Sequence, residues 1–137
     1  MYNLSWIVDN RVILLRNEGK LNGRDLQQLS RDLETMMADA VAPLHIIEDD
    51  RELNKISNID ISTIRDTVKA IDFSKLGYTL AIVPEELEEV TDLLGNFWEL
   101  ITDVDYERVK SVPEAIEFLA QHDATLPERS EWQLELA

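Results

Sequence analysis

Cysteine is absent from this 137-residue chain, which excludes disulfides, thiolate metal sites and thiol nucleophiles. Basic residues are scarce, since 13 Lys and Arg against 28 Asp and Glu leave a formal charge of −15. Such a charge repels nucleic-acid phosphate and anionic membrane surfaces. No apolar run approaches the roughly 20 residues of a membrane span, and residues 1–5 do not resemble a signal peptide. We therefore expect a cytoplasmic protein without nucleic-acid or membrane partners.

Two strand-like runs open the chain, and helix and strand patterns then alternate to its end. Leu4, Trp6 and Val8 alternate with more polar residues, and the run Val12–Leu15 follows an Asp9-Asn10 turn. This pattern predicts a β-hairpin. The whole order predicts one α/β domain over residues 1–123, with a mixed, mostly parallel sheet and packed helices.

The first helix has a clear start and a clear apolar stripe. Gly19 to Gly23 predicts a loop, and Asn22 with Asp25 resembles a capping box. Pro43 ends the helix. Its stripe, which we interpret as core, consists of Leu26, Leu29, Leu33, Met36, Met37, Ala40 and Val41.

The next strand, Leu44–Ile47, is predicted to run into an acidic turn, Glu48-Asp49-Asp50. A second helix carries Ile61, Ile64, Val68 and Ile71 at helical spacing, and a strand follows at Thr79–Val83. The third helix begins at Pro84, and a weaker strand lies around Tyr106–Lys110. The last helix begins at Ser111, Pro113 and Glu114.

A tail of residues 124–137 follows the last helix. Trp132, Leu134 and Leu136 lie there at strand spacing among acids. The tail is therefore expected to pack on the body, to add an edge strand or to be partly mobile, and these alternatives stay open.

Candidate catalytic and metal sites are weak in this sequence. We interpret His45 as a hydrogen-bonded core or sheet residue and His122 as a helix-end residue that suits the dipole. The acids from Glu48 to Glu52 lack the glycine and the oxygen spacing of a calcium loop. No serine has the setting of a catalytic elbow. We therefore expect no enzyme activity, no metal and no cofactor.

The succession of elements resembles the STAS domain, the fold of bacterial anti-sigma-factor antagonists and of the cytoplasmic part of sulfate transporters. Local matches are the Gly19–Leu26 helix entry, the Leu44–Ile47 strand and the closing segment Arg108–Leu119. The resemblance covers roughly residues 4 to 121. It implies a single STAS-like domain that acts as a regulatory protein-interaction module.

The family's signature is Asp, then Ser, Ser or Thr, and Gly at the start of the second helix, where the first Ser is phosphorylated. Ile59-Asp60-Ile61-Ser62-Thr63-Ile64 occupies that place. Aligned on Asp60, the modified serine becomes Ile61. Shifted by one residue, Ser62-Thr63 match, but Ile61 replaces the Asp and Ile64 the Gly. This chain is thus similar to a divergent, uncharacterised branch of the family.

The resemblance makes Ser62 the candidate phosphorylation site, although Asp60 and Ser62 also suit ordinary helix capping. It implies a protein partner, such as a kinase-like or sigma-related regulator, which binds the loop and helix start near residues 50–65. The residues expected to contact this partner are Asp50, Ile59, Asp60, Ile61, Thr63, Ile64 and Arg65.

Two other functions remain open. A carrier of a small apolar or lipid-like ligand is one, because Phe97, Trp98, Met36 and Met37 could line a pocket under the helices. Self-association, including a possible homodimer, is the other, and the apolar residues of the tail motivate it.

Overall fold

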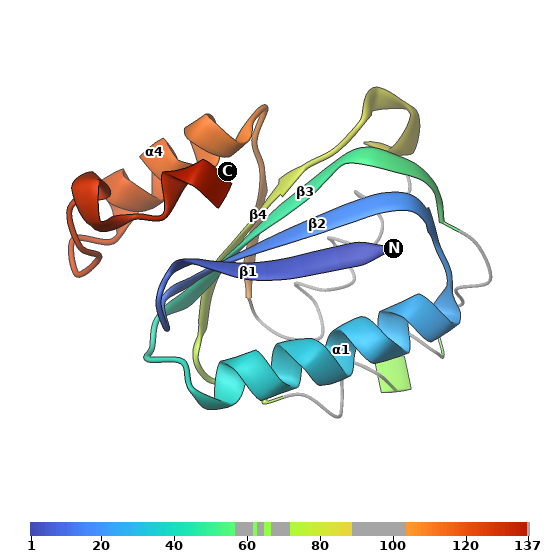
Figure 1. The fold of residues 1–137 in the computed structure, drawn as a ribbon, viewed down its shortest axis with the longest axis horizontal. Helices are drawn as coiled ribbons and strands as arrows, with labels where there is room; N and C mark the ends of the chain where they lie inside the picture. Colours follow the sequence, from blue (N-terminus) through green and yellow to red (C-terminus); the bar gives the residue numbers. More distant parts are fainter. Residues whose placement is uncertain (57–61, 63–64, 67–71, 89–103, 137) are drawn as a thin grey trace.

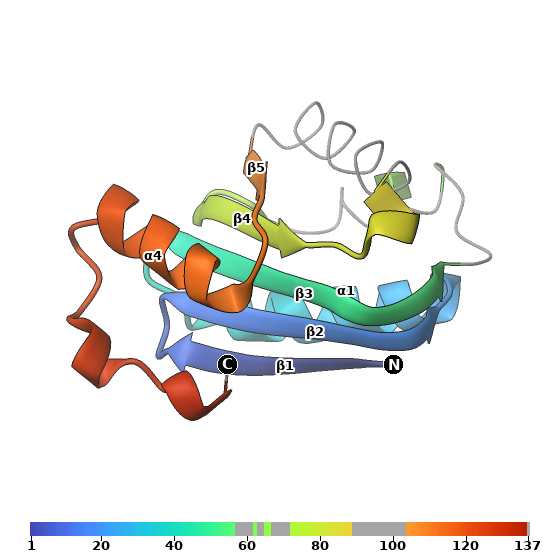
Figure 2. The same ribbon diagram turned by 90° about the horizontal axis from the view of Figure 1, so that it is seen from above.

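A single mixed sheet organises the residues that the computed structural model describes, which are 1–56, 62, 65–66, 72–88 and 104–136. Five strands lie in the order β1-β2-β3-β4-β5 within this part of the chain (Figures 1 and 2). β1 runs antiparallel to β2, and every later strand runs parallel to its neighbour. The predicted α/β fold is therefore confirmed. The strands are β1 (Tyr2–Val8), β2 (Val12–Leu21), β3 (Leu44–Ile56), β4 (Leu76–Ile82) and β5 (Asp105–Arg108).

The predicted N-terminal hairpin is present. Asn10 adopts a positive φ of 64°, which asparagine tolerates better than most residues, and the Arg11 N–H donates to the Val8 carbonyl at 3.0 Å. The loop predicted at residues 19–23 is wrong in its first half, because β2 continues to Leu21. Gly19, with φ 64°, lies at an irregularity in the β2–β3 pairing. Its conformational freedom lets the strand continue past that bulge.

Helix α1 (Gly23–Ala38) begins at the predicted capping box. The Asn22 side chain accepts from the Asp25 N–H at 3.0 Å, and the Asp25 carboxylate accepts from the Asn22 N–H at 3.1 Å. Leu29 and Met37 are buried against the sheet. Val41 is 58% exposed, so its assignment to the apolar stripe is wrong; the helix ends before Val41 and the stripe ends with it.

The acidic turn predicted at residues 48–50 is also wrong. Glu48, Asp49 and Asp50 lie inside β3, which runs on to Ile56. Asp49 is paired with Arg16 of β2 on one side and with Ile82 of β4 on the other. Pairing with two neighbouring strands outweighs the local preference of acidic residues for a turn.

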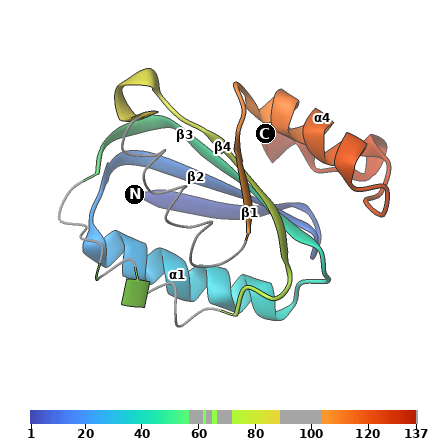
Figure 3. The same ribbon diagram turned by 180° about the vertical axis from the view of Figure 1, so that it is seen from behind.

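Apolar layers cover both faces of the sheet. α1 covers one face, whereas α4 (Val112–His122) and the C-terminal segment cover one end of the other (Figures 2 and 3). In this segment Trp132 is 5% exposed and packs with α4 and β1. The Gln133 N–H also donates to the Ile7 carbonyl of β1 at 2.8 Å. The segment contains the short 3-10 turns η2 (Arg129–Glu131) and η3 (Leu134–Leu136).

The later elements follow the predicted order where the structure describes them. β4 contains most of the predicted 79–83 strand, and the 3-10 turn η1 (Glu85–Leu87) follows Pro84. Ser111 caps α4, and its side chain accepts from the Glu114 N–H. The apolar positions of the predicted second helix (61, 64, 68 and 71), together with Phe97 and Trp98, lie outside the described residues. Among the described helices, none is long and apolar enough to span a membrane.

Candidate functional site

The parallel strands β2 and β3 change from apolar to mostly polar residues part-way along their length. β2 begins with Val12–Leu15 and β3 with Leu44–Ile47, and both are apolar apart from His45. Both strands continue beyond these runs, and most of their later residues are polar or charged. The parallel register sets Arg16 beside Asp49 and Glu18 beside Glu52. The polar halves of both strands therefore form one surface toward their carboxyl ends, where ligands of open α/β sheets gather.

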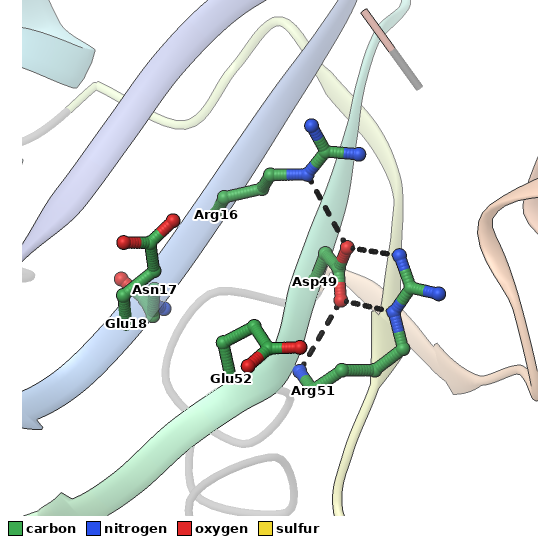
Figure 4. A pocket seen from close by; sticks show the side chains of 6 residues that line it. All are labelled: Arg16, Asn17, Glu18, Asp49, Arg51 and Glu52. Atoms are coloured by element: carbon green, nitrogen blue, oxygen red, sulfur yellow. Dashed lines mark hydrogen bonds and ion pairs between the residues drawn. The ribbon is translucent and has the colours of Figure 1, made fainter.

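Asp49 is the centre of this surface (Figure 4). Its carboxylate accepts from Arg51 Nε at 2.9 Å and Nη2 at 2.7 Å, and from Arg16 Nε at 3.4 Å. The Asp49 side chain is only 5% exposed, whereas those of Arg16 and Arg51 are 33% and 50% exposed. Burial alone would raise the pKa of Asp49, but the hydrogen bonds from Arg51 and Arg16 outweigh it and lower that pKa.

A pocket of about 270 Å³ opens at this cluster. Five of its side chains are charged, two basic and three acidic. Such a lining offers both donors and acceptors to a polar partner and does not suit an apolar ligand. The lining residues are Arg16, Asn17, Glu18, Asp49, Arg51 and Glu52.

A second group of polar side chains is buried between the same two strands. Asn17 is 1% exposed and Asp50 is 3% exposed, and Asn17 Nδ2 donates to Asp50 Oδ1 at 2.7 Å. Burial, then the charge of Asp50, holds the pKa of Glu48 well above its ordinary range. Burial also raises the pKa of Asp50, against hydrogen bonds from Glu48 and Asn17. Glu48 therefore holds its proton to higher pH than an ordinary glutamate, and in its protonated form it lowers the charge buried beside Asp50.

His45 is the core residue that the sequence predicted, at 1% exposed. Its Nδ1 accepts from the Tyr78 N–H at 3.0 Å, so its Nε2 carries the proton that is shared with Asp123 Oδ2 at 2.8 Å. Burial is the main cause of the lowered pKa of His45. Arg11 also pairs with Asp123 at 2.8 Å. Both ring nitrogens are occupied, so this histidine holds β3 to the end of α4 and is not available as a base.

Solved structures similar to this chain share one fold. The first is the anti-sigma factor antagonist SpoIIAA in its unphosphorylated form, with a TM-score of 0.58 and 13% identity over 88% of this chain and 98% of that chain. An uncharacterised protein of the DUF3478 family from Shewanella loihica PV-4, with a SpoIIAA-like fold, has a TM-score of 0.59 and 19% identity over 87% of this chain and 92% of its own.

A third similar structure is the Bacillus cell fate determinant SpoIIAA in its phosphorylated form. Its TM-score is 0.55 and its identity 16%, over 87% of this chain and 99% of that chain. No protein-family model matches the sequence, and no curated protein matches it either. The chain has a SpoIIAA-like fold. The predicted STAS resemblance is thereby confirmed at the level of the fold.

The SpoIIAA-like fold leaves most of the predicted partner contacts undecided. Ile59, Asp60, Ile61, Thr63 and Ile64 lie outside the described residues. Ser62 and Arg65 are both helical and exposed, so both side chains are accessible to a partner or a modifying enzyme. Asp50 is buried in β3 and bonded to Asn17, and it is not a surface group here. The predicted contact therefore stays a prediction, and it does not rest on Asp50.

Sequence reasoning missed the surface around Asp49. It gave no role to Arg16 or Arg51, because it ended both strands at their last apolar residue. A charged residue follows each apolar run within two positions, at Arg16 and at Asp49. Continuing both strands by two residues would have placed these side chains together. The ligand-pocket alternative stays a prediction; of its residues, Met37 packs in the core at 4% exposed.

Proposed function

We propose that this chain is a non-catalytic regulatory module of STAS type that binds a protein partner. The docking surface combines the helix start around Ser62 with the polar surface formed by Arg16, Asp49 and Arg51. The SpoIIAA-like fold supports this proposal, because SpoIIAA is an anti-sigma factor antagonist that occurs in phosphorylated and unphosphorylated forms. Its main support within the chain is the exposed, mixed-charge pocket at the carboxyl half of β2 and β3.

The geometry of this pocket suits protein recognition better than catalysis. Arg51 and Arg16 point their guanidinium groups at Asp49 and are themselves part-exposed. The half-exposed Arg51 guanidinium is positioned to donate to carboxylates or carbonyls of a docked surface. His45, which could have served as a base, has both ring nitrogens engaged. A net charge of −15 favours a partner with a complementary basic patch around this contact.

Phosphorylation of Ser62 would regulate the same contact. A phosphoserine carries about −1.5 to −2 charges at pH 7. Near a helix start it is stabilised by the helix dipole, and its negative charge attracts the basic patch expected on the partner. We therefore infer that the modified form binds its partner more tightly than the unmodified form.

An affinity pull-down from the native cell extract tests this function. Wild type should capture a protein that Asp60→Arg and Arg51→Glu lose. Glu34→Arg, which changes charge by the same amount on exposed α1, should keep it. Mass spectrometry of the recovered chain should find phosphate on Ser62. Capture by Asp60→Arg and Arg51→Glu at the wild-type level would refute the proposed surface.

A further inference from the structure

The outer edge of β1 is unusual for this chain because its strand is uncharged. β1 is the first strand of the sheet, and no other strand of the described residues lies on its outer side (Figure 2). It contains no charged residue and no proline (YNLSWIV), although 30% of the chain is charged. Natural proteins usually protect such edges with charges, prolines or bulges. Apart from the Arg11 N–H in the hairpin turn, the only described N–H group outside the sheet that donates to the backbone of β1 is that of Gln133, at Ile7.

The exposed large apolar side chains of the described part of the chain lie near the two ends of β1. They are Met1, Leu134 and Val41, at 70%, 43% and 58% exposed. Met1 directly precedes β1, and Leu134 lies in η3, which contacts β1. The Val41 N–H donates to the Asn10 carbonyl in the turn that ends β1. An uncharged strand edge with exposed apolar side chains near its ends is typical of an interaction surface.

The hydrogen-bonding pattern between β1 and β2 determines which β1 residues direct their backbone N–H and C=O groups toward the outer edge of the sheet. The Met1 amino group donates to the Glu18 carbonyl at 3.1 Å, and the Glu18 N–H donates to the Met1 carbonyl at 2.8 Å. Met1 therefore directs its backbone groups toward β2. Because this alternates along an antiparallel strand, Asn3 and Ser5 also face β2, whereas Tyr2 and Leu4 present their N–H and C=O groups to the open edge, as does the Trp6 N–H. The alternation breaks after Trp6, where the β1–β2 register shifts and the Ile7 carbonyl accepts from the Gln133 N–H outside the sheet.

We propose that the β1 edge pairs antiparallel with the β1 edge of a second copy of this chain, about a twofold axis at Leu4. In this register Leu4 faces its own copy and Tyr2 faces the second copy's Trp6. All three side chains already belong to the apolar layer under α1, so pairing continues that layer across the twofold. The pairing covers residues 2–6 and ends there, because the Ile7 carbonyl already accepts from the Gln133 N–H on this side.

Charge limits where a second copy can approach. Two chains of −15 repel each other over most of their surfaces, and the neutral β1 strand gives them an edge where no like charges face each other. Strand pairing alone buries less area than a standard interface. The dimer is therefore weak, with a dissociation constant in the micromolar range.

Asn3 and Ser5 provide a matched test of this register. Their side chains lie on the face opposite α1, and the twofold sets Asn3 beside the second copy's Ser5. The double change Asn3→Glu with Ser5→Glu puts like charges opposite each other at two places. The double change Asn3→Glu with Ser5→Lys puts opposite charges there instead. Both variants share the first substitution, and Asn3 neighbours Arg16 within the chain, so the fold itself tolerates Glu there.

Sedimentation equilibrium from roughly 1 µM to 1 mM measures the dimer, and circular dichroism checks folding of each variant. Wild type should dimerise, the Glu/Glu variant should raise the dissociation constant at least about tenfold, and the Glu/Lys variant should restore or tighten it. A wild type that stays monomeric at every concentration would overturn the proposal and leave an extended peptide of another protein as the occupant. Equal dimerisation of the two variants would overturn it as well.

Discussion

Gly77 makes close contact with the side chain that joins β3 to α4. A Cβ atom at this position would lie 2.6 Å from His45 Cε1, 2.7 Å from its Nδ1 and 3.2 Å from Pro43 Cβ. Carbon atoms in good contact lie about 3.5–4.0 Å apart, so the ring would have to move by about 1 Å. The ring is held by Asp123 at 2.8 Å and by the Tyr78 N–H at 3.0 Å. We therefore predict that Gly77→Ala is strongly destabilising.

The size of the effect follows from two costs. Overpacking of a close-packed site costs about 1–3 kcal/mol, and loss of the hydrogen bond from the Tyr78 N–H adds about 0.5–1.5 kcal/mol. Gly77→Ala should thus lower the free energy of unfolding by about 1.5–4.5 kcal/mol. Urea denaturation followed by circular dichroism measures this. Gly19→Ala is the matched control, since Gly19 has φ 64° and no neighbour within 4 Å; it should cost about 1–2 kcal/mol from backbone strain alone.

A double-mutant cycle decides whether the ring is the cause. In a His45→Ala background the imidazole ring that the new methyl group would contact is absent. Gly77→Ala should then lower the free energy of unfolding by less than about 0.5 kcal/mol. Additive effects of His45→Ala and Gly77→Ala would refute the reasoning. A Gly77→Ala cost no larger than that of Gly19→Ala in the wild-type background would refute it too.

Two further predictions concern the same end of the molecule. Because His45 is neutral in the folded chain and its pKa is lowered from 6.5, the unfolded chain takes up the extra proton as the pH falls. The free energy of unfolding should thus drop by up to about 1 kcal/mol between pH 6.5 and 5.5, relative to a His45→Gln variant measured in parallel; parallel pH profiles would contradict this. Trp132 is 5% exposed and donates to the Pro127 carbonyl at 2.9 Å, so Trp132→Ala should cost about 3–5 kcal/mol by urea denaturation, whereas exposed Leu134→Ala should cost under about 1 kcal/mol.

Local signals predicted the elements whose stabilising contacts are near in sequence. The capping box of Asn22 and Asp25, the Asp9-Asn10 turn and the Ser111 cap each involve residues a few positions apart, and each is present. The sequence also marked His45 as a core residue, because an apolar strand surrounds it. Short-range patterns of this kind specify helix starts and turns without knowledge of the tertiary structure.

The acidic stretch of β3 could not be predicted in the same way. Taken alone, Glu48-Asp49-Asp50 favours a turn, and it becomes a strand because β2 and β4 lie on either side. The partners that make its burial tolerable are distant in sequence: Arg16 for Asp49 and Asn17 for Asp50. Burial of a carboxylate is costly without such partners, and a single sequence does not show which residues provide them. The polar surface around Asp49 was missed for this reason.

The proposed dimer edge and the proposed partner surface lie in one row across the sheet. Asn3 of β1 is paired with Arg16 of β2, and Arg16 is paired with Asp49 of β3. A twofold axis between antiparallel edge strands runs perpendicular to the sheet, so the dimer presents both Arg16–Asp49–Arg51 surfaces on the same side. Binding to a surface densely coated with the captured partner then becomes bivalent, which raises apparent affinity by about 10²–10⁴. The Asn3→Glu/Ser5→Glu variant should lose this gain on a dense coating and the Asn3→Glu/Ser5→Lys variant should keep it, while on a sparse coating both bind alike. A difference between them that persists on the sparse coating would show that residue 5 acts on the partner contact itself, and would refute bivalence.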